Sequence, residues 1–290
     1  MNKTNLTGPL TIPMTNDYLF RALLQQNNKV LKGLISSLLH LPFEEIVSVE
    51  ITNPIELGKS IDDKTFFLDI KVLLNSDTVI NLEMQVINEQ NWPERSLSYL
   101  CRSFDSLNKG EGYLEVKSAI QISLLDFTLF PDNPEFYAEY QLLNVKNCIK
   151  YSDKLRLHVL DLTHIDLATE EDKKYQIDYW AALFKTTTWE DLKMLAEKND
   201  AIAEAVETIY KLSEEENIRL QCEAREDYYR RQRDAQILRE RQEQQMQEQK
   251  QQMQEQERQM QELKTENKEL SEQNSQLIAE IERLHAERSK

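Results

Sequence analysis

Glycine and proline are missing from more than half of this sequence. All five glycines and all seven prolines lie before position 135, and neither residue occurs from Glu135 onward. A compact mixed fold needs turns, and these two residues supply the backbone angles that many turns require. The globular part is therefore expected mostly in the first two thirds of the 290 residues, with long helices after it.

Paired cysteines, a leader segment and long apolar runs are lacking as well. Cys101, Cys148 and Cys222 form no C-x-x-C pair and have no histidine at ligand spacing, which argues against a disulfide framework and a structural zinc site. The stretch from Met1 to Leu10 lacks the basic-then-apolar order of a signal peptide. No apolar run approaches the roughly 18 residues that a spanning helix needs. We expect a reduced, cytoplasmic protein with no membrane segment.

Basic residues are outnumbered by acidic ones, with 35 Lys and Arg against 51 Asp and Glu. The formal net charge is −16, and part of the acidic excess comes from glutamates near the C-terminus. Phosphate contacts normally need Lys and Arg, so this charge argues against a strong, autonomous affinity for nucleic acid.

The N-terminal region predicts a helix and then a strand. Residues 16–41 carry apolar side chains at helical spacing, and Pro42 disfavours a continuing helix. Thr15, Asn16 and Asp17 are candidate N-caps for this helix. Residues 46–57 are strand-like, and a polar loop is expected over 58–64.

Two further strands are predicted around the turn-forming stretch 75–78. Apolar and polar positions alternate from Phe66 to Leu73 and again from Ile80 to Val86. Because successive strand side chains point to opposite faces, one face is apolar and the other collects polar groups. A three-residue turn would place Asp69 opposite Glu83, and a five-residue turn would place it opposite Gln85. A four-residue turn would mix the two faces, which is costly. The polar face then carries Asp69, Lys71, Asn81, Glu83 and Gln85.

The remaining chain alternates between strand and helix signals before it becomes strongly polar. A helix is predicted over 94–108, and the nearly continuous apolar run 119–127 predicts a strand covered on both faces. Strands are also predicted over 136–144 and 155–162. Helical spacing returns over 173–210.

The last 78 residues predict a coiled coil. Leucines recur at every seventh position, and Gln249 and Gln256 continue this first seam toward the N-terminus. A second seam lies three residues before each member of the first. This is an a/d heptad register with Asn at two a positions, which favours a parallel, in-register dimer. The alternative is a single solvated helix rich in Gln and Glu. The two seams are Leu263, Leu270, Leu277 and Leu284, and Met246, Met253, Met260, Asn267, Asn274 and Ile281.

Two carboxylates on one face of a strand pair repel each other unless a cation neutralises them. A hard divalent cation with oxygen ligands suits Asp69 and Glu83, Mg²⁺ above all with Mn²⁺ as a substitute, and the Met84 carbonyl could add a ligand. Such a site can activate water and stabilise charge at a scissile phosphate. The alternative is an ordinary solvated sheet face, because the pattern D…E-x-Q is not specific by itself.

The wider sequence context gives a more specific indication. Five short motifs follow one another along the chain: Asn16-Asp17-x-x-Phe20, Leu68-Asp69-Ile70, Leu82-Glu83-Met84-Gln85, Arg95-x-x-x-Tyr99 and Gly110-x-x-Tyr113. With the order of predicted elements, they resemble the Rpn family of recombination-promoting nucleases and transposases, a branch of the PD-(D/E)XK nuclease superfamily. The resemblance spans roughly residues 14–166. It implies an α/β restriction-endonuclease-like core, with a mixed central sheet flanked by helices.

The resemblance also implies functions for individual residues. It implies an Mg²⁺-dependent DNA endonuclease that promotes recombination or transposition, with Asp69 and Glu83 as metal ligands. Gln85 stands where the superfamily usually has Lys, and a neutral amide cannot neutralise developing charge. We hypothesise that Lys71, on the same strand face as Asp69, supplies the missing cation. Asp17 matches an acidic position that often assists the metal site, and its alternative role is a helix N-cap.

Two residues of the helix that follows are candidate DNA contacts. Arg95 and Tyr99 are four residues apart, hence on one helix face. The family pattern favours a phosphate contact by Arg95 with Tyr99 beside it, and the alternative is a stacked surface pair. Trp92 and Trp180 are expected in the core or in an interface rather than as base-stacking platforms.

We therefore expect three parts: a PD-(D/E)XK nuclease-like domain over 1–166, a helical extension over 167–212 and a C-terminal coiled coil over 213–290. The coiled coil would form a parallel homodimer that brings two active sites together, as double-strand cleavage of DNA requires. The competing hypothesis is a catalytically relict nuclease fold that acts as a coiled-coil interaction or oligomerisation protein. Gln85 and the acidic net charge favour this second hypothesis.

Overall fold

A six-stranded mixed sheet forms the centre of the fold in the computed structural model, which describes residues 7–55, 57, 69–105, 107 and 110–288. The strand order across the sheet is β1-β2-β3-β4-β6-β5. The β1–β2, β2–β3 and β5–β6 pairs are antiparallel, while β3–β4 and β4–β6 are parallel. The strands are β1 (Val49–Ile51), β2 (Ile70–Leu74), β3 (Thr78–Gln85), β4 (Ser118–Leu125), β5 (Tyr137–Gln141) and β6 (Leu155–Asp161).

Helices cover both faces of this sheet. Parallel neighbours need a crossover connection, and α3 provides it between β3 and β4. The expected α/β class, a mixed sheet flanked by helices and followed by a long C-terminal helix, is confirmed. The helices are α1 (Asp17–Gln26), α2 (Asn28–Leu38), α3 (Trp92–Phe104), α4 (Glu170–Lys174), α5 (Ile177–Lys185), α6 (Trp189–Ala196), α7 (Asp200–Glu214) and α8 (Glu216–Arg288).

The N-terminal segment differs from the single helix expected over 16–41. Asn27 has an extended backbone (φ −133°, ψ 102°) and separates α1 from α2, and its side chain accepts hydrogen bonds from the N–H groups of Lys29 and Val30 as the N-cap of α2. Asn16 is the N-cap of α1, and Asp17 is the first residue of that helix. The apolar spacing hides the break because both short helices bury the same side against the sheet and the later helices.

The strand expected over 46–57 is also shorter than predicted. Phe43–Glu45 forms a single 3₁₀ turn, and the strand that pairs with β2 is Val49–Ile51. The predicted loop 58–64 and the first part of the predicted strand, 66–68, lie outside the described residues. The strands predicted over 80–86, 119–127 and 155–162 match β3, β4 and β6 closely.

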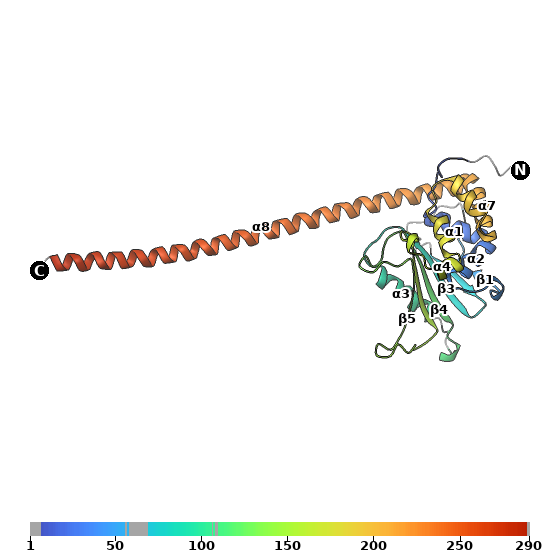
Figure 1. Cartoon of the computed structure of the whole chain (residues 1–290), viewed down its shortest axis with the longest axis horizontal. Helices are drawn as coiled ribbons and strands as arrows, with labels where there is room; N and C mark the ends of the chain where they lie inside the picture. Colours follow the sequence, from blue (N-terminus) through green and yellow to red (C-terminus); the bar gives the residue numbers. More distant parts are fainter. Residues whose placement is uncertain (1–6, 56, 58–68, 106, 108–109, 289–290) are drawn as a thin grey trace. The chain divides into compact units, whose positions relative to one another are not determined.

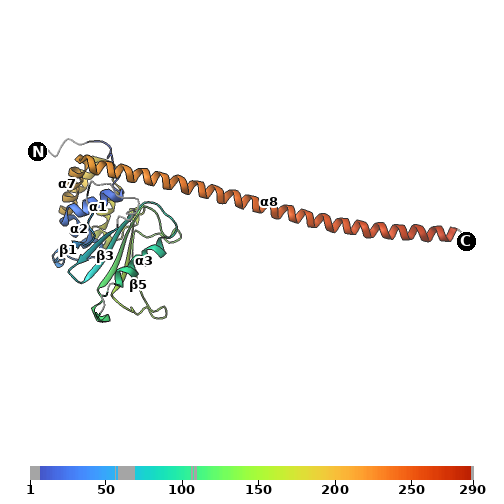
Figure 2. The same cartoon turned by 180° about the vertical axis from the view of Figure 1, so that it is seen from behind.

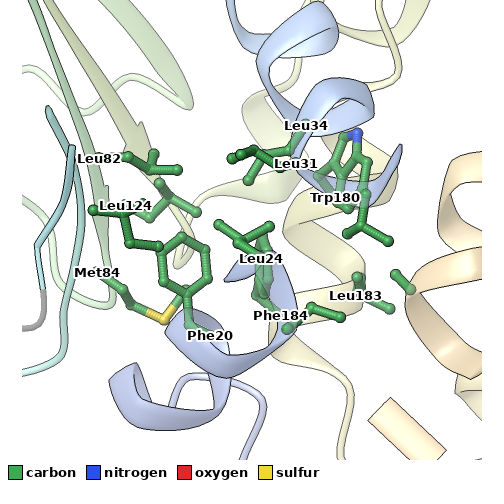
Figure 3. Packing of buried hydrophobic residues seen from close by; sticks show 14 of the residues in the cluster. Phe20, Leu24, Leu31, Leu34, Leu82, Met84, Leu124, Trp180, Leu183 and Phe184 are labelled. Atoms are coloured by element: carbon green, nitrogen blue, oxygen red, sulfur yellow. The ribbon is translucent and has the colours of Figure 1, made fainter. Parts of the chain in front are cut away.

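The two faces of the sheet are covered by different helices. Helices α1, α2 and α7 lie on one side and α3 on the other (Figures 1 and 2). The α1 side contains the large apolar core, in which Phe20 and Leu24 meet Leu82, Met84 and Leu124 of the sheet (Figure 3). The α3 side has a small cluster around Trp92 and Leu100. Polar side chains occupy much of the rest of that face.

The helices after β6 belong to the same core as the sheet. Trp180 is fully buried and donates a hydrogen bond from Nε1 to Ser37 Oγ of α2 at 3.0 Å, and Ile209 and Cys222 are buried in the same cluster. Residues 1–230 form one compact unit and residues 231–290 another. The packing therefore joins the expected nuclease domain, the expected helical extension and the first turns of α8.

The second unit consists of the continuation of α8. This helix is unbroken from Glu216 to Arg288, and the apolar side chains of both predicted seams are exposed in the single chain. An exposed apolar seam along a long helix is what a coiled-coil partner would cover. Across the described parts of the chain, every helix is too short or too polar to cross a membrane.

Candidate active site

The β2–β3 hairpin brings the predicted acidic residues to one face. Leu74 pairs with Thr78 and Ile70 with Leu82, so the turn has three residues, and Asn75 and Ser76 take positive φ values there. Extending this antiparallel register by one residue beyond Ile70 places Asp69 opposite Glu83. Of the two registers that the sequence leaves open, the structure has the one that sets Asp69 opposite Glu83.

Glu83 is the most strongly perturbed carboxyl of this face. It is only 5% exposed, and Arg95 Nη2 lies 2.7 Å from its Oε1. Desolvation raises the pKa of Glu83 to about 7, although the charge of Arg95 opposes the rise and those of Asp69 and Asp17 add to it. Its Oε2 is buried with no hydrogen-bond partner among the described residues. A buried carboxylate oxygen without a partner is costly, and it is a position that a ligand would satisfy.

A cleft of about 870 Å³ lies over this face, between the hairpin, α3 and the start of α8. Four basic and three acidic side chains line it, and two of the basic ones, Arg95 and Arg225, pair with Glu83 and Asp17. Basic side chains such as Lys71 and Arg102 suit a phosphate-bearing substrate. The charged residues are Lys71, Arg95, Arg102 and Arg225, with Asp69, Glu89 and Glu94.

Lys71 and Gln85 both line the cleft. Lys71 is exposed on the same strand face as Asp69, and its backbone N–H donates to Asn53 Oδ1 at 2.8 Å. Gln85 is half-buried at the end of β3, and its Nε2 donates to the Ile87 carbonyl at 3.1 Å. The expected neighbours of the acidic pair are therefore present, with the amide held by the backbone and the ammonium exposed to solvent.

Arg95 is largely buried and is not a freely exposed surface residue. It lines the cleft with 19% of its side chain exposed, and its guanidinium lies 5.5 and 5.6 Å from the ring centroids of Trp92 and Tyr99. Tyr99 also lines the cleft. Arg95 and Tyr99 thus lie side by side as predicted, while the ion pair of Arg95 with Glu83 is an additional contact that the four-residue spacing does not indicate. Trp92 itself is buried, as expected.

Asp17 is held by a residue from the far end of the globular unit. Arg225 Nε donates to Asp17 Oδ1 at 2.9 Å and Arg225 Nη2 pairs with Asp17 Oδ2, with both side chains buried. The N-cap alternative for Asp17 is wrong, because the side chain of Asn16 accepts the capping hydrogen bonds from Tyr18 and Leu19. Sequence spacing could not have revealed Arg225, which lies 208 positions away.

The oxygen donors of this face fit a hard divalent cation. Asp69 and Glu83 supply carboxylate oxygens, and Glu83 Oε2 is buried with no hydrogen-bond partner in the described part of the chain. The Gln85 carbonyl accepts from the Asp126 N–H on the β4 side, so the preceding Met84 carbonyl points to the opposite side, toward β2. Cations that prefer oxygen ligands, such as Mg²⁺, would find ligand atoms here. Among the described residues, no three His, Cys, Asp or Glu side chains gather closely enough to hold a metal ion together.

Comparison with known proteins agrees with the fold and the order of motifs. A family model described as "PD-(D/E)XK nuclease family transposase" matches residues 14–238. The match begins just before α1 and extends through α7 into α8, well beyond the region in which the motifs are found. No curated protein and no solved structure matches the chain.

Proposed function

The chain belongs to the PD-(D/E)XK nuclease family of transposases, and we propose that it is a divalent-cation-dependent DNA endonuclease that acts in recombination or transposition. The observation that carries this proposal is the register that places Glu83 across from Asp69, a residue of the cleft lining, with one buried Glu83 oxygen that has no hydrogen-bond partner among the described residues. This arrangement leaves a site for one cation beside a surface that suits a phosphate.

Asp69, Glu83 and the Met84 carbonyl are proposed to hold a cation, Mg²⁺ or Mn²⁺. When bound, such an ion lowers the pKa of water and balances the charge of the phosphate in the transition state. The chain contributes a rigid hairpin that fixes the spacing of the two carboxylates. Burial of Glu83 disfavours its charged form when no cation is present, and a bound divalent cation would stabilise that charged form.

Three further residues are proposed to act on the DNA rather than on the ion. Lys71, exposed in the cleft, places an ammonium near the phosphate and supplies the charge that Gln85 lacks. Gln85 orients the attacking water by hydrogen bonding. Arg95 shares its guanidinium between Glu83 and the DNA backbone, with Tyr99 beside it.

The continuation of α8 supports a parallel homodimer. The a and d positions of the predicted register remain exposed in one chain, for example 57% for Leu263 and 60% for Leu277. Two chains paired through these seams would provide two active sites for the two strands of a duplex. Sedimentation should therefore find a dimer, and Leu270→Lys with Leu277→Lys should convert it to a monomer. An unchanged dimer would exclude the heptad seam as the interface.

Plasmid nicking in the presence of Mg²⁺ tests the proposed activity. Wild-type protein should convert supercoiled plasmid to nicked and linear forms, and Asp69→Ala and Glu83→Ala should not. Glu50→Ala is a matched control, because Glu50 is an exposed acid on the neighbouring strand β1 and does not line the cleft. Undiminished cleavage by both site variants would overturn the assignment.

A relict nuclease fold that serves as an interaction protein is the second candidate. The Arg95–Glu83 ion pair favours it, because an arginine already neutralises one of the two carboxylates. Gln85 favours it too, since the lysine that the superfamily usually has at that position is absent. Divalent-cation binding separates the two functions: a relict site has no affinity that depends on Asp69.

A further inference from the structure

The first turns of α8 are built into the start of α1. Arg225 binds both oxygens of Asp17, and the rings of Tyr228 and Tyr229 flank its guanidinium at 4.8 and 5.0 Å. Arg225 is 9% exposed and Asp17 is 5% exposed. A buried, bidentate pair stacked on aromatic rings has a fixed geometry, unlike an exposed ion pair whose side chains move freely.

A second contact fixes the same turn of α8. Asn16 Nδ2 donates to the Cys222 carbonyl at 3.0 Å and to Glu226 Oε1 at 2.7 Å, while its Oδ1 caps α1. Cys222 is completely buried in the main core. The position of Arg225 is therefore determined by contacts on both sides of it, and it cannot shift away from Asp17 without disturbing the cap of α1.

The Asp17–Arg225 pair lies next to the candidate active site. Arg225 and Tyr228 line the same cleft as Asp69, Lys71 and Gln85. The charge of Asp17 is close enough to Glu83 to contribute to the raised pKa of that carboxyl. Asp17 is thus a third carboxylate near the acidic pair, but one whose charge is offset by an arginine from α8.

We propose that Arg225 is a positioning residue for the divalent cation of the candidate site: by binding Asp17 and offsetting its charge, it sets how strongly Asp69 and Glu83 hold the ion. This inference rests on the proposed function. In it, Asp17 influences the ion through its charge and is not itself a ligand. Helix α8 thereby contributes to the site the arginine that offsets the charge of Asp17.

The proposal predicts opposite effects for the two members of the pair. Arg225→Gln removes a positive charge and leaves that of Asp17 unbalanced, so Mn²⁺ should bind about tenfold more tightly. Asp17→Asn leaves Arg225 unbalanced, so Mn²⁺ should bind about tenfold more weakly. The double variant Asp17→Asn with Arg225→Gln has a neutral pair and should return to within about twofold of the wild-type affinity. A merely structural pair would shift both single variants in the same direction.

Isothermal titration of the full-length protein with Mn²⁺ at pH 8 measures these affinities, alongside a thermal melt of each variant. Arg225→Lys keeps the charge but loses the two-pronged contact, so it should keep the wild-type affinity even if it melts at a lower temperature. If a single variant does not fold, the affinities of Arg225→Lys and of the double variant still test the proposal. Arg230→Gln is the matched control, because Arg230 is an exposed arginine of the same helix paired with Asp227 at 3.1 Å.

The outcomes separate this inference from the proposed function. If the double variant binds as weakly as Asp17→Asn, Asp17 is itself a ligand and the inference is wrong. Equal affinities across the series, with binding still abolished by Glu83→Gln, would also overturn the inference and leave the nuclease site intact. A wild-type protein that does not bind Mn²⁺ would contradict the proposed function itself.

Discussion

The two faces of the central sheet are made by the same strands but have opposite chemistry. On the α1 side, Leu82, Met84 and Leu124 are buried in an apolar cluster (Figure 3). On the α3 side, Asn81, Glu83, Gln121 and Ser123 are just as buried, and each has a side-chain atom without a hydrogen-bond partner among the described residues. The first face is what a protein core requires, and the second is unfavourable unless it binds something.

This difference indicates that the two faces serve separate purposes. Leu82 and Glu83 are neighbours on β3, yet Leu82 lies on the apolar face and Glu83 on the opposite face, where it contacts Arg95 of α3. Stability should depend on the first residue and activity on the second. Local rules of folding are broken mainly where a function compensates for them.

Glu83→Gln gives the largest expected effect on activity. The amide keeps the size of the side chain but cannot hold a cation with a negative charge, so cleavage of plasmid in Mg²⁺ should fall by about a thousandfold. The variant should remain folded, because the charged form of Glu83 is disfavoured by burial. Initial rates of nicking measure the change, and circular dichroism checks the fold. Wild-type activity in Glu83→Gln would mean that the α3 face is not the active site.

Leu82→Ala should produce the complementary result. Removing a completely buried side chain from the apolar face should lower the free energy of unfolding by about 3 to 4 kcal/mol. The rate of cleavage per folded molecule should stay within about twofold of the wild type, because the adjacent Glu83 faces the other way. Urea denaturation gives the stability. A large loss of activity at full folding would show that the two faces are not independent.

The free energy of unfolding should depend on pH through Glu83 on the α3 face. The pKa of Glu83 is raised from its ordinary 4.5 to about 7, chiefly by desolvation. Its contribution to stability is therefore fully present below pH 4.5 and is lost as the pH rises through 7. Relative to Glu83→Gln, the wild type should lose up to about 3 kcal/mol over that range without divalent cations. Urea titrations of both proteins from pH 4.5 to 8 test this; parallel curves would contradict the raised pKa.

Lys71→Ala should have the smallest effect of this series. Lys71 is exposed, so the free energy of unfolding should change by less than about 0.5 kcal/mol. If Lys71 supplies the charge that Gln85 lacks, cleavage should fall about tenfold, and Lys71→Arg should retain most of it. Lys117, which is exposed just before β4, provides a control as Lys117→Ala. A normal rate for Lys71→Ala would require another source of positive charge in the cleft.

Much of the site could be predicted because it depends on local alternation. The period of two in β2 and β3 placed Asp69 and Glu83 on one face, and the cost of mixing faces excluded one class of turn. The three-residue turn was one of two alternatives that the sequence left open, because a five-residue turn would also keep the polar side chains on one face. Local pattern thus specified the face but not the final register.

Contacts between distant segments could not be predicted in the same way. The apolar spacing does not reveal the break at Asn27, and Arg225 is separated from Asp17 along the chain by the whole sheet and the six helices α2 to α7. The expected boundary near residue 166 followed the extent of the family resemblance, whereas the packing of Trp180 and Cys222 in the main core depends on side-chain fit. Periodicity shows which side of an element is buried, and it does not show which element covers it.

Binding of Mn²⁺ tests the central claim most directly, because it requires no knowledge of the DNA target. Isothermal titration at pH 8 should find one site per chain in the wild type and no measurable binding in Asp69→Asn or Glu83→Gln, while Leu82→Ala should bind as the wild type does. Wild-type affinity that survives both Asp69→Asn and Glu83→Gln, or the absence of any binding by the wild type, would contradict the account.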